Sequence, residues 1–276
     1  MAAKRSGGRS AEDWGRTACR WVMESDRKMT VSDLAARLAG RFELSRCEAR
    51  RRIRSLIEQG RLTYVYHFGQ SYVDLGFQRP TAITPGIVLC PPGCAHSPAG
   101  ETITVILEPG AAFGDGRHPT TRLAAQGLET LGYPETDAGP HHRGIDIGTG
   151  SGILAIVAAR LGVARVDAVD IDPCALSEAR RNIDHNRLGR QITLRPEALE
   201  HLDTHYDLIM ANLRLPTLCG LAPWIESHTH LRAHLLFSGF REQERPALRK
   251  TYPECRYPIR WSGTQAGWCA LVLQRR

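Results

Sequence analysis

The amino-acid sequence predicts an α/β protein in which a doubly wound sheet follows a smaller N-terminal domain of helices and one β-hairpin. Three observations predict this architecture. A glycine-rich turn at 148–152 stands between a short apolar strand and an apolar helical pattern. A second strand, which ends in an acid, follows this turn by about 20 residues. Residues 11–76 instead carry three helical patterns and one alternating hairpin pattern.

Length and composition limit the class of protein. A chain of 276 residues can hold one large domain and one small domain. No apolar run approaches the length of a membrane span, so we expect no membrane insertion. Residues 1–10 are polar and basic, which indicates a flexible tail and not a secretory signal. The eight scattered cysteines favour a reducing cytoplasm over a disulfide framework.

The net charge of +7 is unevenly distributed. Residues 1–79 hold 16 Lys and Arg against 9 Asp and Glu, whereas residues 80–276 hold 20 of each. An arginine-rich codon usage would explain why only three lysines occur, but not this segregation. The N-terminal part is therefore expected to contact an acidic partner, such as nucleic acid or a ribonucleoprotein surface.

The N-terminal domain is predicted at residues 11–76. Helical spacing extends over 11–24 and 33–39, the latter with Ser32 as its cap, and a third helix starts after Ser45 and ends before Gly60. The alternation that follows, interrupted by a turn at 69–70, predicts a hairpin.

Three helices and a hairpin of this size resemble a winged helix, a variant of the helix-turn-helix. Arg50, Arg51 and Arg54 lie on the outer side of the third helix and would meet phosphates first. Winged helices also serve in dimerisation or protein docking, and this alternative stays open.

Residues 77–101 are rich in proline and glycine and are expected to link the two domains, with a short strand at 87–89. Within this segment, Cys90, Cys94 and His96 have the spacing C-x3-C-x-H. Structural zinc sites need four ligands, and no second pair lies nearby in the sequence. We therefore assign no metal.

The glycine turn indicates the class of ligand. In the dinucleotide fingerprint the third glycine comes three places after the second, but that position here is Ile153. The pattern from Asp146 is D-x-G-x-G-x-G, which resembles the first motif of class I S-adenosylmethionine (SAM) methyltransferases. Asp170 ends the next strand, where an acid is expected to accept both hydroxyls of a ribose.

A longer set of motifs narrows the resemblance. Residues 108–121 read E-P-G-A-A-F-G-D-G-R-H-P-T-T, and further matches follow at 146–152, 169–173, 207–213 and 267–269. In this order, over residues 86–276, they closely resemble the PrmA family. Its members are SAM-dependent methyltransferases that trimethylate the ribosomal stalk-base protein L-eleven on amino groups. The resemblance implies a class I methyltransferase domain at 102–276.

The resemblance also implies the roles of particular residues. Asn212 would lie beside the sulfonium and the incoming amine, as the catalytic residue. It follows an apolar strand at 208–210, so it lies where doubly wound sheets bind ligands, and its amide oxygen can orient an amine. The other implied SAM contacts are Thr121, Phe113, Gly148 and Gly150 for the methionine end, and Asp170 for the ribose.

Two further polar residues are considered near this site. His118 is the nearest candidate for a general base, and we interpret it as part of the loop structure because it belongs to a turn-like His-Pro. Glu197, after the third strand, is expected near the adenine.

The sequence departs from the family in two places. The family's N-terminal domain is a small ferredoxin-like sheet, and its residues after the asparagine are small, whereas this chain has Leu-Arg-Leu-Pro at 213–216. The expected function is N-methylation of a protein, on lysine or the amino terminus, with a ribosomal protein as substrate. The alternatives are a methyltransferase of nucleic acid or a small molecule, with the winged helix for docking or dimerisation, and a SAM-sensing DNA-binding regulator. The Asn-Pro-Pro-aromatic sequence of base methyltransferases is absent at 212–215.

Overall fold

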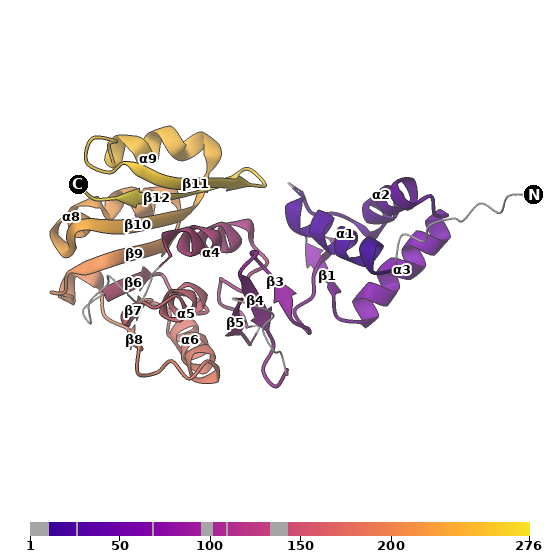
Figure 1. Ribbon diagram of the computed structural model, residues 1–276, viewed down its shortest axis with the longest axis horizontal. Helices are drawn as coiled ribbons and strands as arrows, with labels where there is room; N and C mark the ends of the chain where they lie inside the picture. The colour runs from indigo at the N-terminus through magenta and orange to yellow at the C-terminus, as the bar shows by residue number, and fades with distance from the viewer. Residues whose placement is uncertain (1–10, 26, 68, 95–101, 109, 133–142) are drawn as a thin grey trace, which may run out of the picture. The chain divides into compact units, whose positions relative to one another are not determined.

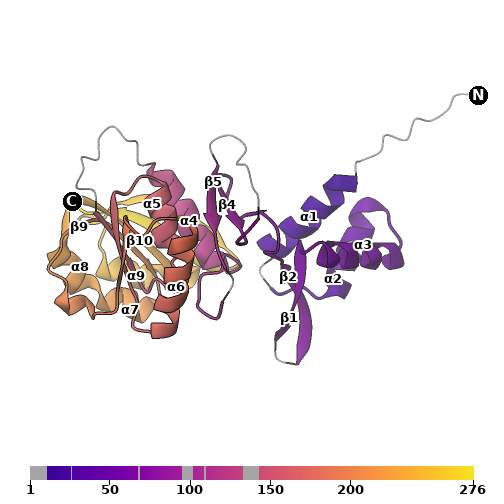
Figure 2. The ribbon, with the colours of Figure 1, turned by 90° about the horizontal axis from the view of Figure 1, so that it is seen from below.

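The computed structural model describes residues 11–25, 27–67, 69–94, 102–108, 110–132 and 143–276. The expected tail at 1–10 and His96 lie outside these residues. The chain folds as two compact units, Met1–Arg79 and Pro80–Arg276 (Figures 1 and 2). None of the helices in the described ranges combines the length and the apolarity needed to cross a membrane.

The first unit has three helices followed by an antiparallel hairpin. An isolated bridge between Met29 and Val73 joins the segment after the first helix to the hairpin. Leu34, Ile53 and Leu56 are fully buried and form its core. This order of elements, three helices and then a hairpin, is the one that the sequence predicts. The elements are α1 (Ala11–Glu24), α2 (Val31–Phe42), α3 (Arg46–Glu58), β1 (Leu62–His67) and β2 (Gln70–Leu75).

The helix caps agree with the sequence in one case and differ in the other. Ser45 caps α3, since its hydroxyl accepts from the Glu48 amide at 3.1 Å. The expected cap at Ser32 is wrong: Thr30 caps α2 in a reciprocal pair with Asp33. This capping box satisfies two amides at once, so the helix begins two residues earlier than expected.

The second unit is built on a seven-stranded sheet of order β11-β12-β10-β9-β6-β7-β8. All neighbours from β10 to β8 are parallel, and β12 runs antiparallel between β10 and β11. The strands are β6 (Arg143–Ile147), β7 (Arg165–Val169), β8 (Ile192–Arg195), β9 (Tyr206–Asn212), β10 (Thr229–Arg241), β11 (Ile259–Gln265) and β12 (Trp268–Gln274).

Helices cover both faces of this sheet, as expected for a doubly wound fold. One face packs a large apolar cluster that includes Phe237, Tyr252 and Leu218, and a second group of helices lies on the other face (Figures 1 and 2). The first group is α7 (Leu215–Gly220), α8 (Ala222–His228) and α9 (Arg245–Thr251), and the second is α4 (Pro119–Leu131), α5 (Ile153–Arg160) and α6 (Pro173–His185).

The segment expected as a linker carries strands of its own. β3 (Thr81–Ala82) and β4 (Ile87–Cys90) form a three-stranded sheet with β5 (Ile103–Ile106). Ile87 and Leu89 are buried in it. The second unit thus starts at Pro80, earlier than the expected residue 102, because alternate apolar residues of this segment pair with β5 and leave the solvent.

Candidate functional site

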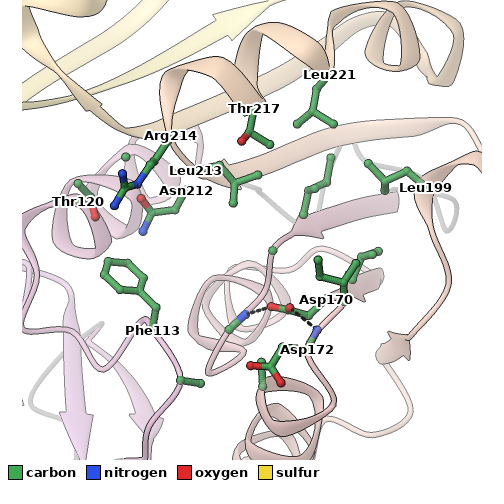
Figure 3. Close-up of a pocket in the computed structure, with 18 of the residues that line it drawn as sticks. Phe113, Thr120, Asp170, Asp172, Leu199, Asn212, Leu213, Arg214, Thr217 and Leu221 are labelled. Atoms are coloured by element: carbon green, nitrogen blue, oxygen red, sulfur yellow. Dashed lines mark hydrogen bonds between the residues drawn. The ribbon is translucent and has the colours of Figure 1, made fainter.

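A pocket opens at the carboxyl ends of β6 and β9. In the sheet, β7 lies beside β6 on one edge and β9 lies beside it on the other. The chain leaves β6 toward β7, whereas it leaves β9 in the opposite direction, toward β10. Connections that leave neighbouring strands in opposite directions create a crevice, which is where doubly wound sheets bind ligands. The pocket has a volume of about 790 Å³, which suits a small molecule (Figure 3).

The glycine turn forms the floor of this pocket. Gly150 has φ +54°, and a Cβ atom there would lie 2.3 Å from the Phe113 carbonyl oxygen. The Ser151 amide donates to the same oxygen at 2.9 Å, and the Ser151 hydroxyl donates to the Gly114 carbonyl at 2.8 Å. Gly150 is therefore required as much by the neighbouring loop as by a ligand.

The Asp146 carboxylate stabilises the glycine turn through hydrogen bonds. Its Oδ2 accepts from the Thr149 hydroxyl at 2.6 Å and from the Ala155 amide at 3.2 Å. Burial raises the pKa of the Asp146 carboxyl to about 6, although these two hydrogen bonds act to lower it. Asp146 is 1% exposed and does not line the pocket. Its role is to keep the glycine turn in shape.

Helix α6 fixes the loop that carries Phe113. The Glu178 carboxylate accepts from the Ala112 amide at 3.0 Å. One turn later, the Asn182 side chain accepts from the Glu108 amide at 2.9 Å and donates to the Ser151 carbonyl at 2.8 Å. Side chains four residues apart lie on one face of a helix, so this face ties the loop and the glycine turn together.

Asp170 lies at the pocket, as predicted from its place after β7. Its Oδ2 accepts from the Gly150 amide at 2.9 Å and its Oδ1 accepts from the Asp172 amide at 3.0 Å (Figure 3). Asp172 caps α6 through its own side chain, with Pro173 at the first helical position. A carboxylate offers about four acceptor sites, so Asp170 retains lone pairs for a ligand's hydroxyls.

Two buried acceptor atoms of the pocket have no hydrogen-bond partner among the described residues: Asn212 Oδ1 and Glu197 Oε2. Buried polar atoms are nearly always paired in folded proteins, and an orphan costs stability. Asn212 ends β9 and Glu197 follows β8, so both lie at the carboxyl edge of the sheet. Their oxygens are suited to accept hydrogen bonds from a bound ligand.

Aromatic side chains line the end of the pocket near Phe113. This residue is 53% exposed, and its ring meets His118 edge to face with centroids 5.2 Å apart. His118 in turn meets Trp268 at 4.9 Å. His118 is also the N-cap residue of α4, with its Nδ1 2.8 Å from the Thr120 hydroxyl. It lines the pocket from this structural position.

Thr121 does not lie at the pocket, contrary to the expectation from the sequence. Five of the six implied SAM contacts line the pocket, but Thr121 does not, and Thr120 lines it instead. Thr121 is fully buried, with its hydroxyl lacking a partner among the described residues. Successive residues of a helix point about 100° apart, so only one of the two can face the pocket. The residues that line it as expected are Phe113, Gly148, Gly150, Asp170 and Asn212.

Other lining residues carried no role in the sequence analysis. Trp268 comes from β12, far along the chain from the glycine turn, and only the sheet order brings it to the pocket. Arg214 also lines the pocket, two residues past Asn212. The departure of residues 213–216 from the small residues of the family was the feature of the sequence that could have indicated it. Leu199, Thr217 and Leu221 complete the side formed by the β8 and β9 connections.

Within the described residues, no group of three or more His, Cys, Asp or Glu side chains is placed to hold a metal ion. Cys90 is buried and Cys94 is partly exposed, and all eight cysteines are unpaired.

The strand order, the glycine turn with an acid behind it, and the pocket at the switch point together define a class I methyltransferase fold. Residues 76–276 match the model of PrmA, the ribosomal protein L11 methyltransferase family. The chain belongs to this family. The match begins at Gly76, so the helices and hairpin of the first unit lie outside it.

Individual relatives agree with this assignment. The chain is 38% identical over 195 residues to the ribosomal protein L11 methyltransferase of Geobacter sulfurreducens, covering 71% of this chain and 62% of that protein. It is 34% identical over 199 residues to that of Trichlorobacter lovleyi, covering 71% and 65%. The crystal structure of a ribosomal protein L11 methylase from Lactobacillus delbrueckii subsp. bulgaricus superposes with a TM-score of 0.63 at 29% identity, covering 72% of this chain and 99% of that one. The chain thus spans less than two thirds of the length of these two curated relatives.

Proposed function

We propose that this protein is a SAM-dependent N-methyltransferase that acts on an amino group of a protein, with a ribosomal protein as substrate. The observation that carries the proposal is the unpaired Asn212 oxygen in a pocket that also holds Asp170. An acceptor atom at this place suits an incoming amine, which brings the hydrogen-bond donors that the oxygen lacks. The names of the curated relatives support the substrate class.

The residues present fit SAM. The Asp170 carboxylate would hold the two ribose hydroxyls, and the unpaired Glu197 Oε2 would accept from the exocyclic amine of adenine. The pocket volume of about 790 Å³ accommodates a nucleoside with an amino acid chain. SAM supplies an electrophilic methyl group on a sulfonium, so the protein's task is mainly to position a neutral nucleophile.

Each residue of the pocket has a distinct part in that task. Asn212 Oδ1 would orient the amine by accepting one of its hydrogen bonds. The half-exposed Phe113 ring would cover the amine and exclude water, which favours the neutral form of a lysine side chain. The proton that the amine gives up passes to water. His118 stays in its capping position in this scheme.

Isotope transfer tests the proposal. The full chain is incubated with methyl-labelled SAM and separate fractions of ribosomal proteins, including L11, ribosomal RNA and DNA. We expect label in a protein band, at lysine or the amino terminus when mapped by mass spectrometry. Label confined to nucleic acid would favour the alternative substrate class. SAM binding without transfer to any fraction of a whole lysate would favour a SAM sensor.

We further propose that the first unit binds nucleic acid, such as ribosomal RNA. Arg46, Arg50, Arg51 and Arg54 are exposed on α3. The adjacent β1 strand exposes Tyr64 by 55% and Tyr66 by 75%. Exposed arginines that meet phosphates, together with aromatic rings on which bases stack, are the usual means of binding single strands.

The salt dependence of binding tests this second proposal. Affinity of the full chain for RNA should fall steeply as salt rises, and replacing Arg50, Arg51 and Arg54 by Gln should flatten that slope. A slope that does not change in the triple variant would favour protein docking.

We also propose that the protein is cytoplasmic. Its eight unpaired cysteines support a reducing compartment.

A further inference from the structure

Arg214 occupies a distinctive place at the pocket. It follows Asn212 by two residues and directly precedes α7. In Figure 3 its guanidinium points toward Asn212 and Thr120, on the same side of the cavity as Phe113. The side chain is exposed. Among the residues that the structure describes, its guanidinium makes no hydrogen bond and no ion pair.

Charge is separated along the pocket. Asp170 and Asp172 lie together at the connection from β7 to α6, across the cavity from Arg214 (Figure 3). Glu197 adds a third carboxylate from the connection after β8. Arg214 is the one arginine or lysine among the described lining residues. The pocket is therefore suited to a ligand that is neutral or donor-rich at one end and anionic at the other.

The glycine turn leaves few donors for an anion. The amides of Gly148 and Thr149 both donate to the Val169 carbonyl at 2.9 Å. The Gly150 amide is held by Asp170 at 2.9 Å. The amides of residues 151 and 152 donate to the Phe113 and Thr149 carbonyls, each at 2.9 Å. Each amide of residues 148–152 already has a partner within the protein, so an anionic group must bind elsewhere.

We propose that Arg214 binds a carboxylate at the Asn212 end of the pocket and thereby fixes the ligand's position. An arginine fork matches a carboxylate with two parallel hydrogen bonds, which no other lining side chain can provide. Building on the proposed function, two ligands could bring this group. One is the methionine end of SAM, and the other is an acceptor whose amine stands beside a carboxylate.

The first arm of the test measures the methionine end. Calorimetry compares S-adenosylhomocysteine, which has the carboxylate, with 5′-methylthioadenosine, which lacks it. If Arg214 holds the nucleoside, Arg214→Gln should weaken S-adenosylhomocysteine about 10- to 100-fold and leave 5′-methylthioadenosine unchanged. Arg214→Lys, which keeps the charge but loses the fork, should fall between. Arg190→Gln, an exposed arginine outside the pocket, is the matched control and should bind both ligands as the wild type does.

The second arm measures the acceptor. L-Glutamate, which carries an amine and two carboxylates, is titrated into the wild type and into Arg214→Gln, with and without S-adenosylhomocysteine. Binding of L-glutamate to the wild type loaded with S-adenosylhomocysteine that is at least 10-fold weaker in the loaded variant assigns the carboxylate to the acceptor, since the methionine end is then already occupied. An Arg214→Gln protein that matches the wild type in both arms would overturn the proposal. If the wild-type protein binds neither nucleoside, the proposed use of SAM is refuted instead. This outcome does not depend on any Arg214 variant, so it is distinct from a failure of the Arg214 proposal.

Discussion

The amide of Gly150 donates to Asp170 Oδ2 at 2.9 Å, which joins the glycine turn after β6 to the acid after β7. The same carboxylate receives the Asp172 amide at the start of α6. Asp170 is therefore both a candidate ligand contact and a link between two parallel strand ends. A substitution there changes the shape of the site as well as its chemistry.

Asp170→Ala should weaken S-adenosylhomocysteine binding about 10- to 100-fold, because the ribose hydroxyls lose a charged acceptor. It should also cost about 1 kcal/mol of unfolding free energy, since two backbone amides lose their partner. Calorimetry and chemical denaturation measure the two effects. Asp170→Asn keeps one acceptor oxygen and is the control for shape. Unchanged affinity in Asp170→Ala would remove this residue from the site.

Asn212→Ala should separate binding from transfer. The nucleoside contacts proposed for Asp170 and Glu197 remain, so affinity for S-adenosylhomocysteine should stay within a few-fold of the wild type. Methyl transfer in a single turnover should fall about 100-fold, because the amine is no longer oriented. Stability should hold or rise by about 1 kcal/mol, since a buried acceptor without a partner is removed. A full rate of transfer would show that Asn212 does not position the amine.

Gly150→Ala should disrupt the turn. The new Cβ would lie 2.3 Å from the Phe113 carbonyl oxygen, in a backbone conformation with φ +54° that L-residues avoid. The conformation alone costs about 1–2 kcal/mol, and the clash adds to it. Gly220→Ala is the matched control, because nothing lies within 4 Å of its Cβ position in α7. Denaturation midpoints should fall for the first variant and hold or rise for the second; equal midpoints would contradict this account.

Asp146 should make stability depend on pH. Burial raises the pKa of its carboxyl to about 6 in the folded protein, against about 3.9 in an unfolded chain. The folded state therefore binds the proton more tightly, and the resulting stability is fully present below about pH 4 and lost as pH rises through 6. Between pH 4 and 7, the wild type should lose about 2–3 kcal/mol of unfolding free energy relative to Asp146→Asn.

Chemical denaturation at several pH values measures this difference in unfolding free energy. Hydrogen exchange of the β6 amides provides a second measurement. Comparison with the asparagine variant removes the contributions of all other titrating groups. Parallel stability curves for the two proteins would mean that the Asp146 carboxyl has the same pKa in the folded and unfolded states, and would contradict this account.

The spacing of residues along the chain was sufficient to predict the doubly wound sheet and much of the site. A strand, three alternating glycines and an apolar helix can be read from consecutive residues, and the acid after the next strand follows at the expected distance. Parallel strands place their carboxyl ends at one edge, so the positions of Asp170 and Asn212 in the chain are enough to assign them to one pocket. Family membership then follows from motifs that keep their order along the chain.

Contacts between distant segments decided the rest. The choice of Thr120 over Thr121 depends on how α4 is rotated against β10, where the Ser238 hydroxyl donates to the Thr120 carbonyl at 3.0 Å. The segment expected as a linker forms part of a sheet because β4 pairs with β5. Trp268 reaches the pocket only because β12 inserts beside β10. The sequence alone determined which residues end each strand, since that depends on neighbours in the chain. Tertiary structure decided which side chains face the cavity and which buried acceptor oxygens remain unpaired, because both depend on packing between elements far apart in sequence.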